Sequence, residues 1–300
     1  MIKRVVTIVN PAYLSLKNCQ MVVRVTKPGE EETTATVPIE DIGVLVMEHL
    51  QITITQALMA ALVENNIAIV TCNEQHMPVA LNLPLDGHNL QTERFREQLN
   101  ASEPLRKQLW QQTVQQKIRN QAALLDNLGL ECRNMLQWAQ EVHSGDSTHM
   151  EGRAAVYYWK TIFPSIPNFV RGQNEAPPNN LLNYGYAIVR AMMARALVAS
   201  GLLPTLGIFH HNRYNAYCLA DDIMEPYRPY VDEDIVEMMG WNVSYEKLSY
   251  EHKTKLLSLP VKEVVIEGHR SPMQLAILRT AQSLQQCFAG DIRKIVYPTL

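Results

Sequence analysis

Three residues of types that bind divalent metals stand far apart in the second half of the sequence: Glu151, His210 and Glu225. Asp222 precedes Glu225 by three residues, so these two carboxylates would share one face of a helix. Carboxylates with an added imidazole suit Mg²⁺ or Mn²⁺, because these ions favour oxygen ligands and tolerate a nitrogen. The residue types therefore make metal-assisted chemistry one candidate function.

Each of these residues also has an ordinary structural explanation. Two ionised carboxylates about 5 Å apart repel by roughly 3 kcal/mol at an effective dielectric constant near 20. Such a pair persists when it is solvated, paired with Arg213 or Arg228, or neutralised by a cation. An acid in a first helical turn is favoured by the helix dipole, and a lone histidine after an apolar run is commonly a hydrogen-bonded core residue. Spacing alone leaves these interpretations open.

The composition is that of an ordinary globular protein, with 47% apolar and 19% charged residues. A net charge of −3 excludes a uniformly basic, histone-like protein, but a local basic stripe would still bind nucleic acid. The five cysteines are scattered and form no C-x-x-C pair. This argues for reduced thiols and against a disulfide framework or a zinc site.

No segment predicts a membrane anchor or an export signal. The apolar run Val5–Val9 is too short for a signal peptide. The longest apolar helix candidate, residues 181–203, contains Arg190 and Arg195, which favours a core helix over a membrane span. We therefore expect a cytoplasmic protein that does not associate with membranes.

The first 85 residues are predicted to be strand-rich. Short β-branched or apolar runs alternate with turn residues, with one helix predicted at 53–65 and a further strand at 67–71. The segment Leu83–His88 combines proline, glycine and polar residues, and the hydrophobic period changes after it. The domain boundary is therefore placed there.

The remainder of the chain has helical periodicity. Ser102 and Pro104 are typical of a helix start, and an apolar stripe runs on from Leu105 to Leu125. A capping cluster at 144–149 precedes a helix that begins near Glu151, and a long helix at 181–199 ends at Gly201. We predict a two-domain α+β protein, with a small N-terminal β-rich domain (1–85) and a larger all-α catalytic domain (86–300).

Four segments occur together in a characteristic order. They are Glu151–Ala155, Asn183–Ala187, Gly201–Pro204 with Gly207–His210, and Leu219–Pro229. Together they resemble the CRISPR-associated spacer-acquisition integrase, the universal first subunit of the adaptation machinery, in its type II branch. The resemblance spans nearly the whole chain, and the joint occurrence of the four motifs is specific.

The resemblance implies a metal-dependent DNA endonuclease and integrase. Glu151, His210 and Glu225 would be the catalytic ligands of Mg²⁺ or Mn²⁺, with Asp222 as a further or water-mediated ligand. His210 is preferred to His211, because the family histidine lies three residues after the glycine, here Gly207. In the implied reaction, the 3′-hydroxyl of a spacer attacks a phosphodiester at the CRISPR repeat. Such a reaction requires no covalent protein–DNA intermediate.

The implied partners are double-stranded DNA, a second copy of the chain bound through the β domain, and a small ferredoxin-like second subunit in a heterohexamer. Type II effector and accessory adaptation proteins complete the expected set. The DNA-binding candidates are Arg153, Arg171, Arg213, Arg228 and Tyr184. Internal salt bridges for the arginines and a packed core position for the tyrosine are the alternatives.

Three other functions remain open from the sequence. One is a different metal-dependent phosphodiester hydrolase with the same ligands. The second is a non-catalytic DNA-binding scaffold whose acids are merely solvated, and the third is a purely structural helical protein. Asp221 competes with Asp222 for the acidic role, although Asp222 fits the spacing better.

Overall fold

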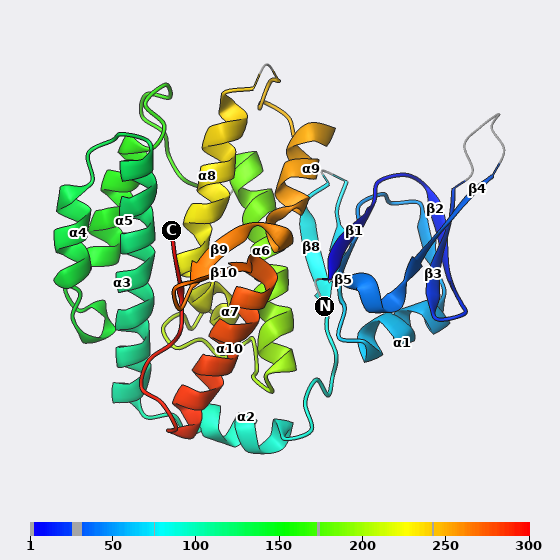
Figure 1. The fold of residues 1–300 in the computed structure, drawn as a ribbon, viewed down its shortest axis with the longest axis horizontal. Coiled ribbons are helices and arrows are strands. Elements are labelled where there is room, and N and C mark those ends of the chain that lie inside the picture. Colours follow the sequence, from blue (N-terminus) through cyan, green and yellow to red (C-terminus); the bar gives the residue numbers. More distant parts are fainter. Residues whose placement is uncertain (1–2, 26–31, 75, 173–174, 242) are drawn as a thin grey trace. The chain divides into compact units, whose positions relative to one another are not determined.

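The computed structural model describes residues 3–25, 32–74, 76–172, 175–241 and 243–300. The chain divides into two compact units, residues 1–89 and 90–300 (Figure 1). The division lies four residues beyond the boundary predicted after residue 85. The last strand of the first unit ends at Asn82 and the first helix of the second begins at Gln91, so the join falls within the irregular segment between them.

The N-terminal unit consists of two four-stranded sheets and one helix. The first sheet has the order β1-β5-β7-β8, with β1, β5 and β7 parallel and β8 antiparallel to β7. The second has the order β4-β3-β2-β6. The strands are β1 (Arg4–Ile8), β2 (Ala12–Lys17), β3 (Gln20–Val25), β4 (Thr33–Pro38), β5 (Ile42–Met47), β6 (Ile52–Ile54), β7 (Ala68–Cys72) and β8 (Pro78–Asn82).

The helix of this unit, α1 (Gln56–Glu64), begins later than the predicted residue 53. Residues 52–54 instead form β6, which pairs in parallel with β2. The Thr55 side chain then accepts a hydrogen bond from the Leu58 amide and so caps the helix. Leu58 and Leu62 are buried in one cluster with residues of both sheets, including Leu14 and Leu45.

The C-terminal unit is mainly helical. Its helices are α2 (Gln91–Leu99), α3 (Glu103–Asn127), α4 (Arg133–Gln140), α5 (Met150–Thr161), α6 (Asn179–Ala199), α7 (Cys218–Ile223), α8 (Arg228–Met239), α9 (Tyr250–Leu257) and α10 (Met273–Ala289). Single 3-10 turns occur at η2 (Ser144–Asp146), η3 (Glu225–Tyr227) and η4 (Leu259–Val261), and η1 (Ile39–Asp41) lies in the first unit. Figure 1 shows α3 beside α4 and α5, and α6 among α8, α9 and α10. Among the described residues, no helix combines the length and apolarity needed to cross a membrane.

The prediction of an all-α second domain is wrong, because a three-stranded antiparallel sheet lies within it. Its strands, in the order β10-β9-β11, are β9 (Glu263–Ile266), β10 (His269–Pro272) and β11 (Pro298–Thr299). In β9, exposed residues alternate with the buried Val264 and Ile266. Glu267 and Gly268 both have positive φ, the conformation that a tight two-residue hairpin turn requires. Four residues are too short a run for the alternation to stand out between helical segments.

Candidate functional site

Two of the predicted metal ligands, Glu151 and Glu225, form ion pairs with the same lysine. Lys117 lies on the buried side of α3, and its Nζ is 2.7 Å from Glu151 Oε1 and 2.6 Å from Glu225 Oε2. Glu151 lies in the first turn of α5, and Glu225 begins η3. Packing of α3 against α5 and η3 thus brings together carboxylates from distant parts of the chain.

Local structure holds each glutamate in place. The predicted capping cluster supplies Asp146, whose carboxylate accepts hydrogen bonds from the Met150 amide at 2.8 Å and the Glu151 amide at 3.0 Å. These bonds satisfy amides at the start of α5 and fix its first turn. The Asn120 side-chain amide donates to the Pro226 carbonyl at 2.7 Å, which ties the turn after Glu225 to α3. Both carboxylates therefore sit on anchored backbone.

Glu225 is buried between two cations. Arg228 Nη2 lies 3.0 Å from its Oε1, on the side opposite the Lys117 contact at Oε2. Burial by itself raises the pKa of Glu225, but Arg228 and Lys117 outweigh it and leave the pKa below its usual value. Burial likewise opposes the charge of Lys117, and Glu225 and Glu151 outweigh it, so the pKa of Lys117 is raised. Glu225, Lys117 and Arg228 are therefore charged at neutral pH.

His210 is oriented by Asp222. The ring Nδ1 lies 2.5 Å from Asp222 Oδ1, and Asp222 Oδ2 accepts the Phe209 amide at 2.9 Å and the His210 amide at 3.3 Å. Asp222 is fully buried. An ionised carboxylate only accepts hydrogen bonds, so Nδ1 carries the proton and Nε2 of a neutral ring keeps its lone pair. This is how a carboxylate prepares a histidine to bind a metal.

The pKa of the His210 ring is raised above its usual value. The hydrogen bond to Asp222 is the main cause of a raised His210 pKa, burial opposes it, and the charges of Glu225 and Glu151 add to the rise. Burial raises the pKa of Asp222, against the lowering effect of the His210 contact. The charges of Asp222, Glu225 and Glu151 thus all favour the protonated form of the imidazole.

Aromatic packing fixes the loop that carries His210, which lies between α6 and α7. Trp110 is fully buried in α3. The Phe209 ring stacks on it at 4.4 Å with an interplanar angle of 3°, and the His210 ring meets it edge-on at 5.5 Å. The imidazole is thus held by a carboxylate and by an indole, which leaves it little rotational freedom.

A close approach at Gly207 shapes the same loop. A Cβ at this position would lie 2.8 Å from Asp222 Oδ2 and closer still to the His210 carbonyl oxygen. We expect Gly207→Ala to lower the free energy of unfolding by about 1–3 kcal/mol, because the loop must shift to admit the methyl group. Thermal unfolding measures this, with Gly152→Ala as the control, since a Cβ there meets nothing within 4 Å. Equal melting temperatures for the two variants would contradict the expectation.

The donor types of the cluster fit a divalent cation, but the carboxylates are closed around Lys117. Among the described residues, no group of three His, Cys, Asp or Glu side chains is arranged to hold a metal ion. The buried Glu225 Oε2 is 2.6 Å from Lys117 Nζ, yet this ion pair lacks hydrogen-bond alignment. The two carboxylates and the imidazole are donor types that such an ion accepts, and Lys117 occupies the position between the carboxylates.

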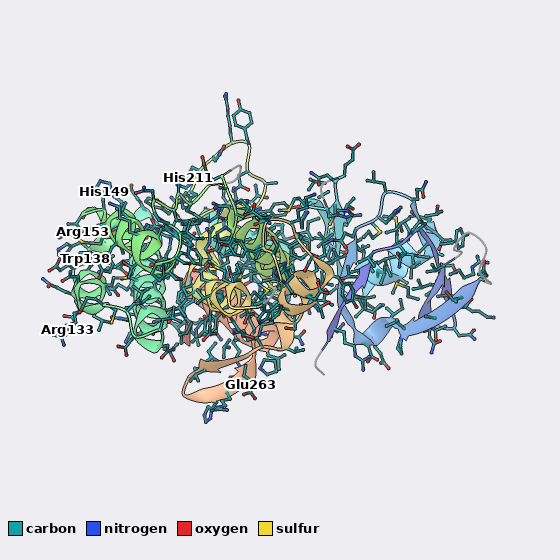
Figure 2. All side chains as sticks on the ribbon, turned by 90° about the horizontal axis from the view of Figure 1, so that it is seen from above. Arg133, Trp138, His149, Arg153, His211 and Glu263 are labelled. Atoms are coloured by element: carbon teal, nitrogen blue, oxygen red, sulfur yellow. The ribbon has the colours of Figure 1, made fainter. Side chains whose placement is uncertain are left out.

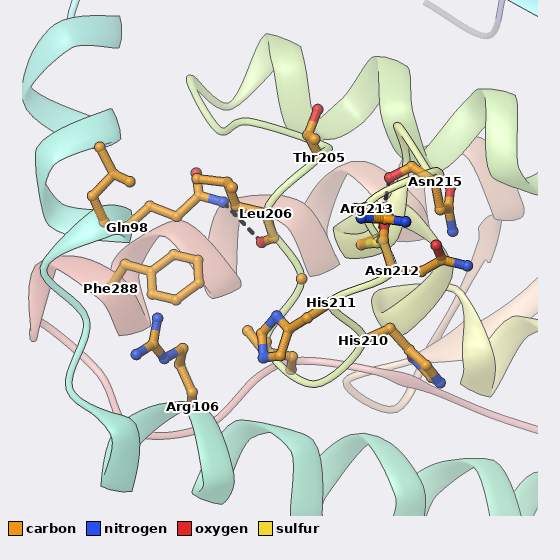
Figure 3. Close-up of a pocket in the computed structure, with 14 residues that line it drawn as sticks. Gln98, Arg106, Thr205, Leu206, His210, His211, Asn212, Arg213, Asn215 and Phe288 are labelled. Carbon is orange, nitrogen blue, oxygen red and sulfur yellow. Dashed lines mark hydrogen bonds between the residues drawn. The ribbon is translucent and has the colours of Figure 1, made fainter.

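The alternative site residues have other surroundings. Asp221 binds Arg190 Nε at 2.6 Å and the Asn215 side-chain amide at 2.7 Å, so it belongs to a separate ion pair. His211 is exposed and lines a cavity of about 320 Å³ with Arg106 and other residues. His210 lines the same cavity, but Figure 3 shows the His211 ring directed toward Arg106 and the His210 side chain directed away from it.

The predicted DNA contacts divide into exposed and occupied side chains. Arg153 is exposed, and its Cζ lies 4.6 Å from the centre of the Trp138 ring. Figure 2 labels both residues. Arg213 is exposed beside Tyr214. Arg171 is half-buried, donates to Asn179 and Gly172, and lies over the Tyr186 ring.

Two of these candidates do not face solvent as expected. Arg228 is committed to Glu225 and lies over the ring of Tyr186, so it balances charge within the site. Tyr184 has 0% of its surface exposed, and the prediction that it contacts DNA is corrected. It lies in α6, a helix buried on nearly every side, where a tyrosine is a packing residue.

Lys117 is a site residue that was not predicted from the sequence. The positions flanking it on the buried side of α3 are Thr113, Val114, Ile118 and Gln121, with helical spacing. A lysine at such a position is rarely buried unless it is paired. A lysine within the buried stripe of a helix could therefore have indicated, from the sequence, that an acidic side chain pairs with it in the folded protein.

Residues 6–259 match the family described as CRISPR associated protein Cas1. One relative, the CRISPR-associated endonuclease Cas1 of Neisseria meningitidis serogroup C (strain 8013), is 37% identical over 284 residues. The alignment covers 94% of this chain and 91% of the relative.

Solved structures share the fold at low sequence identity. A casposase bound to integration product aligns with a TM-score of 0.80 and 19% identity, covering 98% of this chain and 92% of the casposase chain. A Cas6-RT-Cas1–Cas2 complex aligns with a TM-score of 0.76 and 18% identity, covering 98% of this chain and 36% of that chain. These matches include both the β-rich and the helical unit.

Proposed function

Because the chain belongs to the Cas1 family of CRISPR-associated proteins, we propose that it is a divalent-metal-dependent DNA endonuclease and integrase of CRISPR adaptation. The observation that carries the metal dependence is the convergence of Glu151 and Glu225 on one cationic position. The orientation of the nearby His210 by the buried Asp222 supports it. Two carboxylates and an imidazole nitrogen are the donors that Mg²⁺ or Mn²⁺ accepts.

The residues of the site have distinct tasks in this proposal. Glu151, Glu225 and His210 would hold the ion, which would neutralise phosphate charge and favour an ionised hydroxyl nucleophile. Asp222 keeps the His210 proton on Nδ1, so that Nε2 would keep its lone pair for an ion. Arg228 keeps Glu225 ionised. Asp222 is therefore a positioning residue in this proposal and not a direct ligand.

The proposed reaction joins DNA ends. The 3′-hydroxyl of a spacer attacks a phosphodiester at the CRISPR repeat, and the 3′-oxygen of the repeat strand leaves. The O–P bond that forms replaces the one that breaks, so no co-reactant is consumed. The casposase that shares this fold is described as bound to an integration product, which supports this reaction class. The exposed Arg153 and Arg213 remain the candidates for phosphate contacts.

The proposed assembly follows the resemblance. Two copies of the chain would pair through their β-rich units, and a small Cas2 subunit would bridge two such dimers into a heterohexamer. The solved Cas6-RT-Cas1–Cas2 complex supports the Cas2 partner. Type II effector and accessory adaptation proteins are further proposed partners.

A strand-transfer assay tests the proposed function. A labelled duplex with free 3′-hydroxyl ends is incubated with a plasmid that carries a CRISPR repeat, with the second subunit present. We expect label joined to the plasmid in Mg²⁺ or Mn²⁺, and none with EDTA or with 3′-deoxy ends, because the hydroxyl is the nucleophile.

Two results of this assay would contradict the proposed function, and each would indicate a different alternative. Metal-dependent cleavage without joined product would indicate a plain phosphodiester hydrolase. DNA binding without any metal-dependent reaction would indicate a scaffold, and either result would overturn the proposal.

A further inference from the structure

The side chain of Lys117 occupies an unusual position for a lysine. It projects from the buried side of α3, and only 11% of the side chain is exposed. Its Nζ lies within 2.7 Å of a carboxylate oxygen from each of two glutamates that are far apart in sequence. The ammonium group of a surface lysine that pairs with an acid remains hydrated. The Lys117 side chain is largely shielded from water, and two carboxylates surround its ammonium group.

Such an arrangement has electrostatic consequences in both directions. A buried ammonium group is unfavourable unless opposite charges compensate it, and Glu151 and Glu225 do so here. Conversely, without the ammonium the two carboxylates would repel each other at close range. Of the two glutamates, Arg228 pairs with Glu225, through Oε1, whereas Lys117 pairs with Oε2. Lys117 is therefore the one described cation within ion-pair distance of both glutamates.

We propose that Lys117 is a built-in counter-ion that occupies the cation position between Glu151 and Glu225 and must be displaced before a divalent metal binds. This inference rests on the proposed metal-dependent function and adds a step to it. In the metal-free protein, Lys117 keeps the two ligand carboxylates close together. When the metal enters, the ammonium group leaves the same oxygens. Lys117 thus stabilises the empty site and weakens metal binding.

Replacing Lys117 should therefore lower the stability of the metal-free protein and strengthen its binding of the metal. Lys117→Met keeps a side chain of similar length and removes the charge. We expect the metal-free variant to have a lower melting temperature than the wild type, because the carboxylates lose their shared cation. We expect its Kd for Mn²⁺ to be lower by about tenfold or more, because the metal no longer competes with an ammonium group. The rise in melting temperature on adding Mn²⁺ should also be larger than in the wild type.

Lys107→Met is the matched control. Lys107 lies on the same helix and contacts a single carboxylate, Glu103, at 2.6 Å on the surface. Free Mn²⁺ is followed by electron paramagnetic resonance and unfolding by calorimetry, so neither measurement depends on activity. The Lys107 variant should keep the wild-type Kd.

A second measurement uses the wild-type protein, in case the Lys117 variant does not fold. Lysines are acetylated briefly with an activated ester, with and without Mg²⁺, and the sites are quantified by mass spectrometry. We expect acetylation of Lys117 to increase several-fold with Mg²⁺, while that of Lys107 stays constant. An unchanged modification of Lys117 would overturn the proposal.

The outcomes separate this inference from the function on which it rests. A wild type that joins strands and binds Mn²⁺, with an unchanged or higher Kd in Lys117→Met, overturns the role of Lys117 alone. In that case the lysine is a structural partner or helps assemble the site. A wild type that binds no Mn²⁺ overturns the metal-dependent function itself, and the inference falls with it.

Discussion

Replacing His210 by alanine is expected to lower the rate of strand transfer by about 10³-fold while DNA binding largely survives. The loss follows because Asp222 holds the proton on Nδ1 of this ring and so leaves Nε2 as the proposed nitrogen donor to the cation. DNA affinity comes mainly from phosphate contacts elsewhere, so it should change little. Single-turnover strand transfer measures the first effect, and fluorescence anisotropy with labelled duplex measures the second.

His211→Ala is the matched control, since it removes the adjacent imidazole of the same loop. Both histidines line the same cavity, but the exposed His211 ring is directed toward Arg106, whereas the His210 side chain is directed away from Arg106 (Figure 3). This variant should keep strand transfer within a few-fold of the wild type. An equal loss from His211→Ala alone would show that the wrong imidazole has been assigned.

Asp222→Asn is expected to lower the rate of strand transfer by about 10²-fold, although this residue is not assigned as a ligand. The asparagine oxygen can still accept the Phe209 amide, but its amide group would donate toward His210 Nδ1. The ring proton would then move to Nε2 and remove the lone pair that faces the cation. The fold should be largely retained, because the loop keeps its backbone hydrogen bond.

Two observations distinguish this positioning role from a loss of stability. The ¹⁵N shifts of the His210 ring report the tautomer directly and should change in Asp222→Asn. Asp221→Asn is the control, because Asp221 pairs with Arg190 and does not contact His210. If Asp221→Asn reduced strand transfer as much, or if the His210 tautomer did not change, the assigned role of Asp222 would be wrong.

Much of the secondary structure follows from local sequence. Ser102 caps α3 through a hydrogen bond from the Leu105 amide, as the Ser–Pro pattern predicted. The strand-rich start and the helical remainder were also apparent, because hydrophobic periodicity records which face of an element is buried. The sheet of β9, β10 and β11 was not apparent. Its last strand is two residues long and pairs with a segment more than thirty residues earlier, so only long-range pairing defines it.

The sequence by itself determined the residue types of the site, their anchoring motifs and the family. Only the tertiary structure decided that Glu151 and Glu225 both pair with Lys117. It likewise decided that the Asp222 oxygens bind the His210 ring and the backbone amide of Phe209. It also placed Tyr184 in the core. The physical reason is that spacing predicts neighbours only within one helix or strand. The meeting of α3, α5 and η3 depends on how whole elements bury their apolar faces against one another, which no local pattern contains.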